Sequence, residues 1–212
     1  MKMGEETICY QEANALSISK RKLLYGVGVN DSLYKIKRTV NGKVEVCPFY
    51  LTWSSMLKRC YSKTHYKKHP TYVGCTVCTE WHIFSTFKAW MKLQDYVNKE
   101  LDKDLLFRDN KIYSPEKCIF VSQAINNLIK KANNKKSNTP TGVCWDIKRQ
   151  QYKSCCNVNG KQKTLGYFKT EELAYQKYKE CKKEVIICLA NQQQDTRLKD
   201  ALLTIAKDGY YD

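Results

Sequence analysis

Apolar residues recur at helical spacing in two segments of the first half of the chain. In FYLTWSSMLKRCYS, residues 49–62, the apolar positions share one face of a helix: Trp53, Met56, Leu57 and Cys60. The segment EWHIFSTFKAWMKLQDY, residues 80–96, repeats this spacing with Trp81, Phe84, Phe87, Trp90 and Met91. Both stripes predict amphipathic helices whose aromatic side chains form a core, and not a surface on which bases stack.

Alternation of polar and apolar residues predicts strands on either side of these helices. YKIKRTVNGKVEV, residues 34–46, predicts a hairpin that turns at Asn41-Gly42, because these two residue types accept a positive φ. Asn159-Gly160 predicts a second turn of the same kind. Three strands are predicted near the carboxyl end, at about 142–148, 151–157 and 161–168.

Two helices are predicted after these strands. Thr170 is expected to cap the first, with Glu171 and Glu172 in its first turn, where negative charge suits the helix dipole. The second is the modestly amphipathic segment NQQQDTRLKDALLTIA, with Asp195 or Thr196 as the cap. The stripe of the first helix that is expected to be buried against the sheet consists of Leu173, Ala174, Tyr178 and Cys181.

These elements predict an α+β protein in five parts. A basic linker is placed at 131–141, within IKKANNKKSNTPTG, because that stretch is poor in apolar residues, rich in Asn and Lys, and closed by Thr139-Pro140. The other parts are an N-terminal extension with the hairpin (1–46), a central module (47–130), a small three-stranded antiparallel sheet packed on one helix (142–190) and a C-terminal helix (191–212).

The charge of the chain points to a polyanionic partner. Among 212 residues there are 37 Lys and Arg against 21 Asp and Glu, a formal net charge of +16. No apolar run approaches the roughly 20 residues of a membrane span, and the first residues lack the order of a signal peptide. We therefore expect a cytoplasmic protein with no membrane partner, whose partner is nucleic acid.

Eleven cysteines are many for a protein of this compartment, and their odd number argues against a complete disulfide framework. Cys75 and Cys78 form a CxxC pair, with Cys60 upstream and Cys118 downstream. Four thiolates suit tetrahedral zinc, which would stabilise a segment with a small core. Cys47 is an alternative to any of the four, and buried free thiols are the alternative to zinc.

The stretch ELDKDLLFRDNKIYSPEKCIFVSQAINN, residues 100–127, has the order of a compact nuclease motif. An acidic strand end is followed by a turn with Asn110 and then by a helix that carries Asn126 and Asn127. With Trp53 and MLKRCY, and with VCTEWHIFSTFKAW, it resembles a large group of phage-encoded HNH-type homing-like endonucleases. The resemblance covers roughly residues 47 to 130 and would place the protein in the cytoplasm of the host cell.

That resemblance implies a degenerate HNH-like ββα-metal module with surrounding helices. In such modules an Asp holds a divalent metal, a His is the general base, and an Asn or His on the helix completes the site. By similarity Asp102 takes the metal position with Asp104 nearby, Lys103 replaces the His, and Asn126 takes the helix position. The expected metal is Mg²⁺ or Mn²⁺. Because a lysine of ordinary pKa is protonated, Lys103 is expected to clamp a phosphate instead of accepting a proton.

The three histidines offer a base from outside the motif. His65 and His69 lie in the basic loop THYKKHPTYVGCTVC, where contact with phosphates is the alternative. His82 follows Trp81 on a predicted helix, where a structural role is the alternative.

The segment from residue 141 to 185 resembles the Apetala/ethylene-response-factor type of DNA-binding domain. The matching residues are Gly142-Val143, Tyr152, Leu165-Gly166 with Phe168, and KTEELAYQKY. That family lays its sheet in the major groove of DNA, and the resemblance implies the same docking here. The positions it implies as facing DNA are Cys144, Asp146, Lys153, Cys155, Asn157, Gln162 and Thr164.

Further cations at strand ends and turns are predicted to contact phosphates. They are Lys148, Arg149, Lys161 and Lys163, together with Lys130, Lys131, Lys135 and Lys136 of the linker. A small sheet-and-helix domain that binds protein is the alternative for this part of the chain.

Three functions follow from these expectations. The first is metal-dependent cleavage or nicking of double-stranded DNA, directed by the carboxyl-terminal domain. The second is a catalytically inactive nucleic-acid-binding regulator, or modulator of host processes, on the same fold. The third is an RNA-directed variant. The sequence leaves the target, the oligomeric state and the biological role open.

Overall fold

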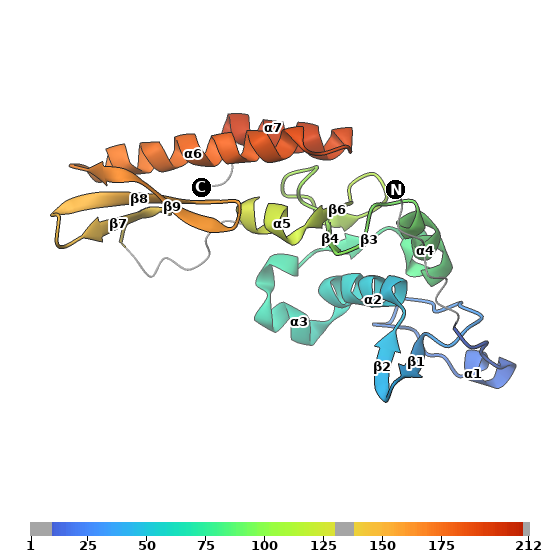
Figure 1. Cartoon of the computed structure of the whole chain (residues 1–212). Helices are drawn as coiled ribbons and strands as arrows, with labels where there is room; N and C mark the ends of the chain where they lie inside the picture. Colours follow the sequence, from blue (N-terminus) through green and yellow to red (C-terminus); the bar gives the residue numbers. More distant parts are fainter. Residues whose placement is uncertain (1–9, 130–137, 210–212) are drawn as a thin grey trace. The chain divides into compact units, whose positions relative to one another are not determined.

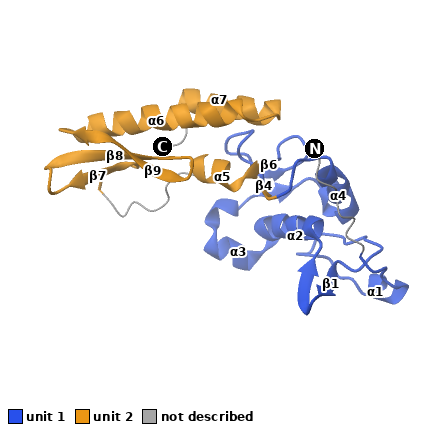
Figure 2. Ribbon diagram, in the orientation of Figure 1, with its two compact units in different colours: residues 1–97, 101–120 blue, residues 98–100, 121–212 orange. Residues whose placement is uncertain are grey.

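The computed structural model describes residues 10–129 and 138–209 and contains helices and small sheets (Figure 1), so the predicted α+β class is confirmed. The chain divides into two compact units (Figure 2). The first consists of residues 1–97 and 101–120, and the second of residues 98–100 and 121–212. Among the described residues, no helix combines the length and the apolar character that crossing a bilayer requires.

The first unit contains short helices and two complete small pairs of strands. Its hairpin turns at Asn41 and Gly42, with φ of 49° and 74°, as the sequence predicts. Strands β4 (Lys99–Asp102) and β6 (Ile119–Ser122) are hydrogen-bonded to each other and each crosses the boundary between the units. The remaining elements are α1 (Ala15–Ser19), β1 (Lys37–Val40), β2 (Lys43–Val46), α2 (Pro48–Tyr61), α3 (Lys63–Lys68), η1 (Pro70–Tyr72), β3 (Thr76–Val77), η2 (Thr79–His82), α4 (Phe84–Lys92) and β5 (Ile112–Tyr113).

The core of this unit lies where α2 meets α4 and η2. All four residues of the predicted stripe of α2 are buried, and the indole Nε1 of Trp53 donates to the main-chain oxygen of Trp81 at 2.7 Å. Phe84, Phe87 and Met91 of α4 are buried as predicted. Trp81 is also buried, although it belongs to the 3₁₀ turn η2 and not to the helix. Trp90, the remaining member of the second predicted stripe, is half-buried and packs against this core. The aromatic stripes are therefore core, as expected.

The second unit is built on a three-stranded antiparallel sheet with the order β7-β8-β9. Helix α6 packs on the sheet and α7 packs on α6, as Figure 1 shows. Thr170 caps α6 and Asp195 caps α7, both through side-chain oxygens that accept main-chain N–H groups. The elements are α5 (Gln123–Ile129), β7 (Val143–Asp146), β8 (Gln151–Val158), β9 (Lys161–Phe168), α6 (Glu171–Asn191) and α7 (Thr196–Asp208).

One residue of the predicted buried stripe of α6 is exposed. Ala174 and Tyr178 are buried and Cys181 is half-buried, but Leu173 is 56% exposed. The buried residues continue to Ile186 and Ala190, so the stripe runs through Ala174. Leu173 lies about 100° around the helix from that line, which explains why the prediction for it was wrong.

Candidate nucleic-acid interface

The predicted metal-binding aspartate closes the turn that follows β4. The Oδ1 of Asp102 accepts hydrogen bonds from the main-chain N–H groups of Asp104 and Leu105, both at 2.8 Å. Burial raises the pKa of Asp102, and these two donors only partly oppose that effect. The carboxyl group therefore has a structural role in the turn, whatever else it binds.

Lys103 is a buried lysine, 5% exposed, held by two oxygens. Its Nζ donates to Oδ1 of Asp104 at 2.5 Å and to the main-chain oxygen of Asn110 at 2.7 Å. The amide of Asn110 donates in turn to the main-chain oxygens of Lys103 and Ile112. These bonds fasten the loop between β4 and β5. The two bonds from Nζ use two of the three N–H donors of the ammonium. A phosphate clamp at Lys103 stays a prediction.

The predicted helix residue lies in the second unit. Asn126 is buried on α5, and its Nδ2 donates to a carboxylate oxygen of Glu100 on β4. Asn127 accepts from Nε2 of Gln123 at 2.9 Å. Asp102, Lys103 and Asp104 thus lie in the first unit, whereas Asn126 and its hydrogen-bond partner Glu100 belong to the second.

The cysteines predicted to bind zinc are buried thiols in the first unit. Cys60, Cys75 and Cys118 are at most 2% exposed, and Cys78 is half-buried. Burial raises the pKa of Cys60 and of Cys118 to about 12, and that of Cys78 to about 11. Within residues 10–129 and 138–209, no three His, Cys, Asp or Glu side chains gather as a metal-ligand set. Zinc at these cysteines stays a prediction.

Two of the three histidines lie against each other. The ring centroids of His65 and His69 are 4.5 Å apart, and the buried Nε2 of His65 has no hydrogen-bond partner. Burial lowers the pKa of His65, and the charges of His69 and Lys58 lower it further. The Nε2 of His82 is 3.2 Å from the hydroxyl of Tyr61, which fits the structural role considered for it.

The strand register of the second unit gathers the residues implied to face DNA. Directly opposed residues of an antiparallel pair have side chains on the same face of the sheet. Lys153 opposes Cys144 on one side, and Cys155 and Asn157 alternate with it along β8. On β9, Thr164 opposes Cys155 and Gln162 opposes Asn157. We call this surface the polar face: Cys144, Asp146, Lys153, Cys155, Asn157, Gln162, Thr164 and Tyr167. Cys155 is buried, only 9% exposed, so the expectation that its side chain faces DNA is wrong.

The opposite face of the sheet is the one that α6 covers. Ser154 and Cys156 on that face are 0% and 3% exposed, and burial, together with the nearby Cys181 of α6, raises the pKa of Cys156 to about 11. Lys163 opposes Cys156, and Lys161 is two residues before it on β9, so the register places both on this face. These two cations and Lys153 therefore lie on different faces of the sheet.

Tyr167 belongs to the polar face although strict alternation along β9 excludes it. Alternation from Gln162 and Thr164 would bring Gly166 to that face, but the register shifts between Ser154 and Cys155, and Tyr167 lies opposite Lys153. An extra residue in one strand reverses the facing of all later residues. A glycine inside a strand can indicate a bulge, and Gly166, whose φ is 151°, is the sequence signal from which this one could have been predicted.

Arg149 is fixed over this face at the turn between β7 and β8. Its NH1 is 3.3 Å from Oδ2 of Asp146, and its guanidinium lies 4.4 Å from the ring centroid of Tyr167. The main-chain N–H of Arg149 donates to Asp146 and is the main reason that the pKa of Asp146 is lowered. The arginine is thus oriented before any ligand arrives. The linker lysines predicted to contact phosphate, Lys130, Lys131, Lys135 and Lys136, lie outside the described residues.

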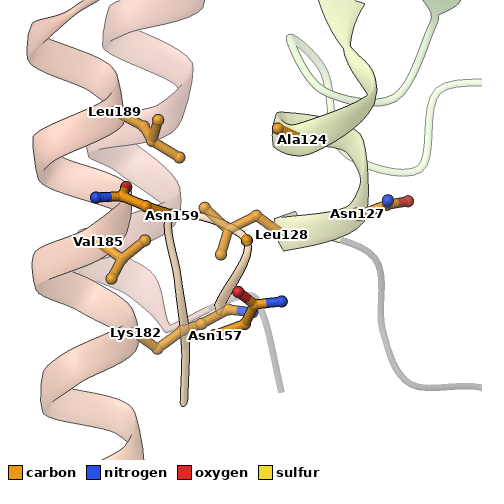
Figure 3. A pocket seen from close by; sticks show the side chains of 9 residues that line it. Ala124, Asn127, Leu128, Asn157, Asn159, Lys182, Val185 and Leu189 are labelled. Carbon is orange, nitrogen blue, oxygen red and sulfur yellow. The ribbon is translucent and has the colours of Figure 1, made fainter. Parts of the chain in front are cut away.

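A cavity of about 320 Å³ adjoins the polar face within the second unit (Figure 3). Leu128 of α5 points toward Val185 and Leu189 of α6, and the turn at Asn159 lies between the two helices. Its walls are mostly apolar and the lining includes one cation, Lys182, so it lacks the group of cations that typically holds a phosphate.

No protein-family model, curated protein or solved structure matches this chain. The resemblances in the sequence therefore rest on the quoted motifs alone. Function is argued from the geometry of the site, because a fold by itself does not specify an activity.

Proposed function

We propose that this chain binds duplex DNA by docking the polar face of the β7-β8-β9 sheet on the double helix. The supporting observation is the register, which gathers Lys153 with the amide side chains of Asn157 and Gln162 on the face opposite α6. Amide side chains read base edges in the major groove, and cations bind phosphates. A three-stranded ribbon has dimensions that the major groove accepts.

The charge around this face supports a polyanion. Residues 143–168 include one acidic residue, Asp146, which is already paired with Arg149. The cations of the same range are Lys148, Arg149 and Lys153 at or beside the polar face, and Lys161 and Lys163 on the opposite face. With the net charge of +16 of the whole chain, this excess gives a field that attracts DNA from a distance.

The test is titration of the full chain into a fluorescent duplex at several salt concentrations. Neutralising about five phosphates gives a log–log slope near −4.5. Lys153→Gln should weaken binding about tenfold and reduce the slope by about one. Lys207→Gln, the same change on an exposed lysine of α7, is the matched control and should bind nearly as the wild type does. A flat salt dependence, or equal losses in both variants, would reject docking through the polar face.

Phosphodiester cleavage is a second proposal, supported by the order of elements around Asp102. Strand β4 ends at this residue, β6 is hydrogen-bonded to β4, and α5 with Asn126 follows β6 directly. This is the strand–strand–helix order that the HNH resemblance implies. Mg²⁺ or Mn²⁺ would be held by Asp102 with Asp104 and would stabilise the departing oxyanion.

A further inference from the structure

Ile147 is an exposed apolar residue at the tip of the sheet. It is 76% exposed and is the first of the four residues that join β7 to β8. An apolar side chain in this position adds nothing to the core of the second unit. Single exposed apolar residues are common on proteins, so its meaning depends on how the tip is built.

Two hydrogen bonds hold the backbone of this tip. The N–H of Arg149 donates to Oδ1 of Asp146 at 3.0 Å, and Nε2 of Gln150 donates to the main-chain oxygen of Ile147 at 2.8 Å. The guanidinium of Arg149 also lies over the ring of Tyr167. A β-branched side chain on a fixed turn has few conformations to lose when it enters a ligand.

The residues beside Ile147 combine apolar and cationic character. Lys148 and Arg149 follow it, and Trp145, which is 43% exposed, precedes it on β7 but lies by register on the face opposite the polar face. Proteins that kink DNA insert an apolar side chain between two base pairs while nearby cations hold the flanking phosphates. The tip also continues directly into the polar face, whose amides suit base edges and not lipid.

We propose that Ile147 is a wedge that inserts between two base pairs and bends the duplex bound by the polar face. This inference rests on the proposed DNA binding. It adds one specific contact, which is apolar and does not depend on hydrogen bonds. It also predicts that part of the protein's preference for particular DNA sequences comes from how easily a base-pair step unstacks.

The test measures bending and binding separately, on the full chain. A duplex of about 25 bp with a dye at each end reports bending through energy transfer. Wild type should raise the transfer efficiency on saturation, and Ile147→Ser should lose most of this rise while binding about three- to tenfold more weakly. Ile147→Leu should keep the bend because it stays apolar. Leu173→Ser, the same loss of an exposed apolar side chain on α6, should behave as wild type.

Each failure points to a different conclusion. If wild type binds without bending, or Ile147→Ser bends DNA as wild type does, the wedge is wrong and DNA binding stands. If wild type binds no duplex, the proposed function fails and the wedge fails with it. A parallel arm uses vesicles of phosphatidylserine and phosphatidylcholine. Binding to them that depends on Ile147, with DNA bending unchanged in Ile147→Ser, would replace the wedge by a membrane contact.

Discussion

Lys103 and Asn110 hold each other's main chains through reciprocal hydrogen bonds. Nζ of Lys103 is 2.7 Å from the main-chain oxygen of Asn110, and Nδ2 of Asn110 is 2.8 Å from the main-chain oxygen of Lys103. The lysine stands where the HNH resemblance expects a histidine, and in this structure it secures the loop. A cation in this position can serve the fold without taking part in any reaction.

Asn110→Ala should therefore destabilise the protein. The substitution leaves the main-chain oxygens of Lys103 and Ile112 without this donor; the first bond is buried and the second part-buried, and a buried loss costs about 1–3 kcal/mol. We expect the free energy of unfolding, measured with urea, to fall by about 2–3 kcal/mol. Asn191→Ala, at an exposed position at the end of α6, should change it by less than about 0.5 kcal/mol. Equal effects would show that the reciprocal bonds contribute little.

The pH dependence of stability should carry the signature of Asp102. Because burial raises its pKa above the ordinary 3.8, the folded protein binds this proton more tightly than the unfolded chain does. The contribution of the protonated Asp102 to the free energy of unfolding is fully present below pH 3.8 and is lost as the pH rises through the raised pKa of this group.

Asp102→Asn removes this titration and keeps an Oδ1 that can accept from Asp104 and Leu105. Urea midpoints should show the variant gaining stability relative to wild type as the pH rises from about 3 to about 7. Asp109→Asn, whose carboxylate side chain is 87% exposed, should show no such trend. If the difference in urea midpoint between Asp102→Asn and wild type stays constant across this pH range, the raised pKa of Asp102 is contradicted.

The buried cysteines make a separate prediction about zinc. If Cys60, Cys78 and Cys118 share a zinc ion, purified protein should contain about one equivalent, and Cys118→Ser should release it. Cys144→Ser, at an exposed position, should keep the metal. With a pKa of about 12, the thiols of Cys60 and Cys118 stay protonated at neutral pH unless a metal displaces the protons. No zinc on elemental analysis, with unchanged melting after chelation, would identify them as buried free thiols.

Nicking of supercoiled plasmid in Mg²⁺ or Mn²⁺ tests the second proposed function. Asp102→Ala should abolish nicking and leave DNA affinity nearly unchanged, since one carboxylate near DNA opposes binding only slightly. Lys103→His should preserve or raise the rate, because an imidazole with a pKa of about 6.5 can accept a proton at neutral pH. Thermal melting must first show that Lys103→His is folded. If wild type nicks DNA no faster than Asp102→Ala does, and both proteins still bind DNA, the cleavage proposal is wrong. The module would then serve only as a scaffold for DNA recognition.

The sequence alone determined the elements whose formation depends on neighbouring residues. Asn41-Gly42 specifies a hairpin because both residues accept a positive φ. Thr170 and Asp195 cap helices because their side chains reach N–H groups two or three residues ahead. The stripe from Trp53 to Cys60 is buried as its spacing predicts. Each of these signals acts within one or two turns of the chain.

Only the tertiary structure decided which side chains meet over longer distances. Tyr167 reaches the polar face because a register shift, set by pairing between strands, reverses the facing of part of β9. Lys103, a residue type that is usually exposed, is buried because Asn110 and Asp104 provide oxygens for its ammonium. Such placements depend on pairing and packing across the fold, which the local pattern of residues does not encode.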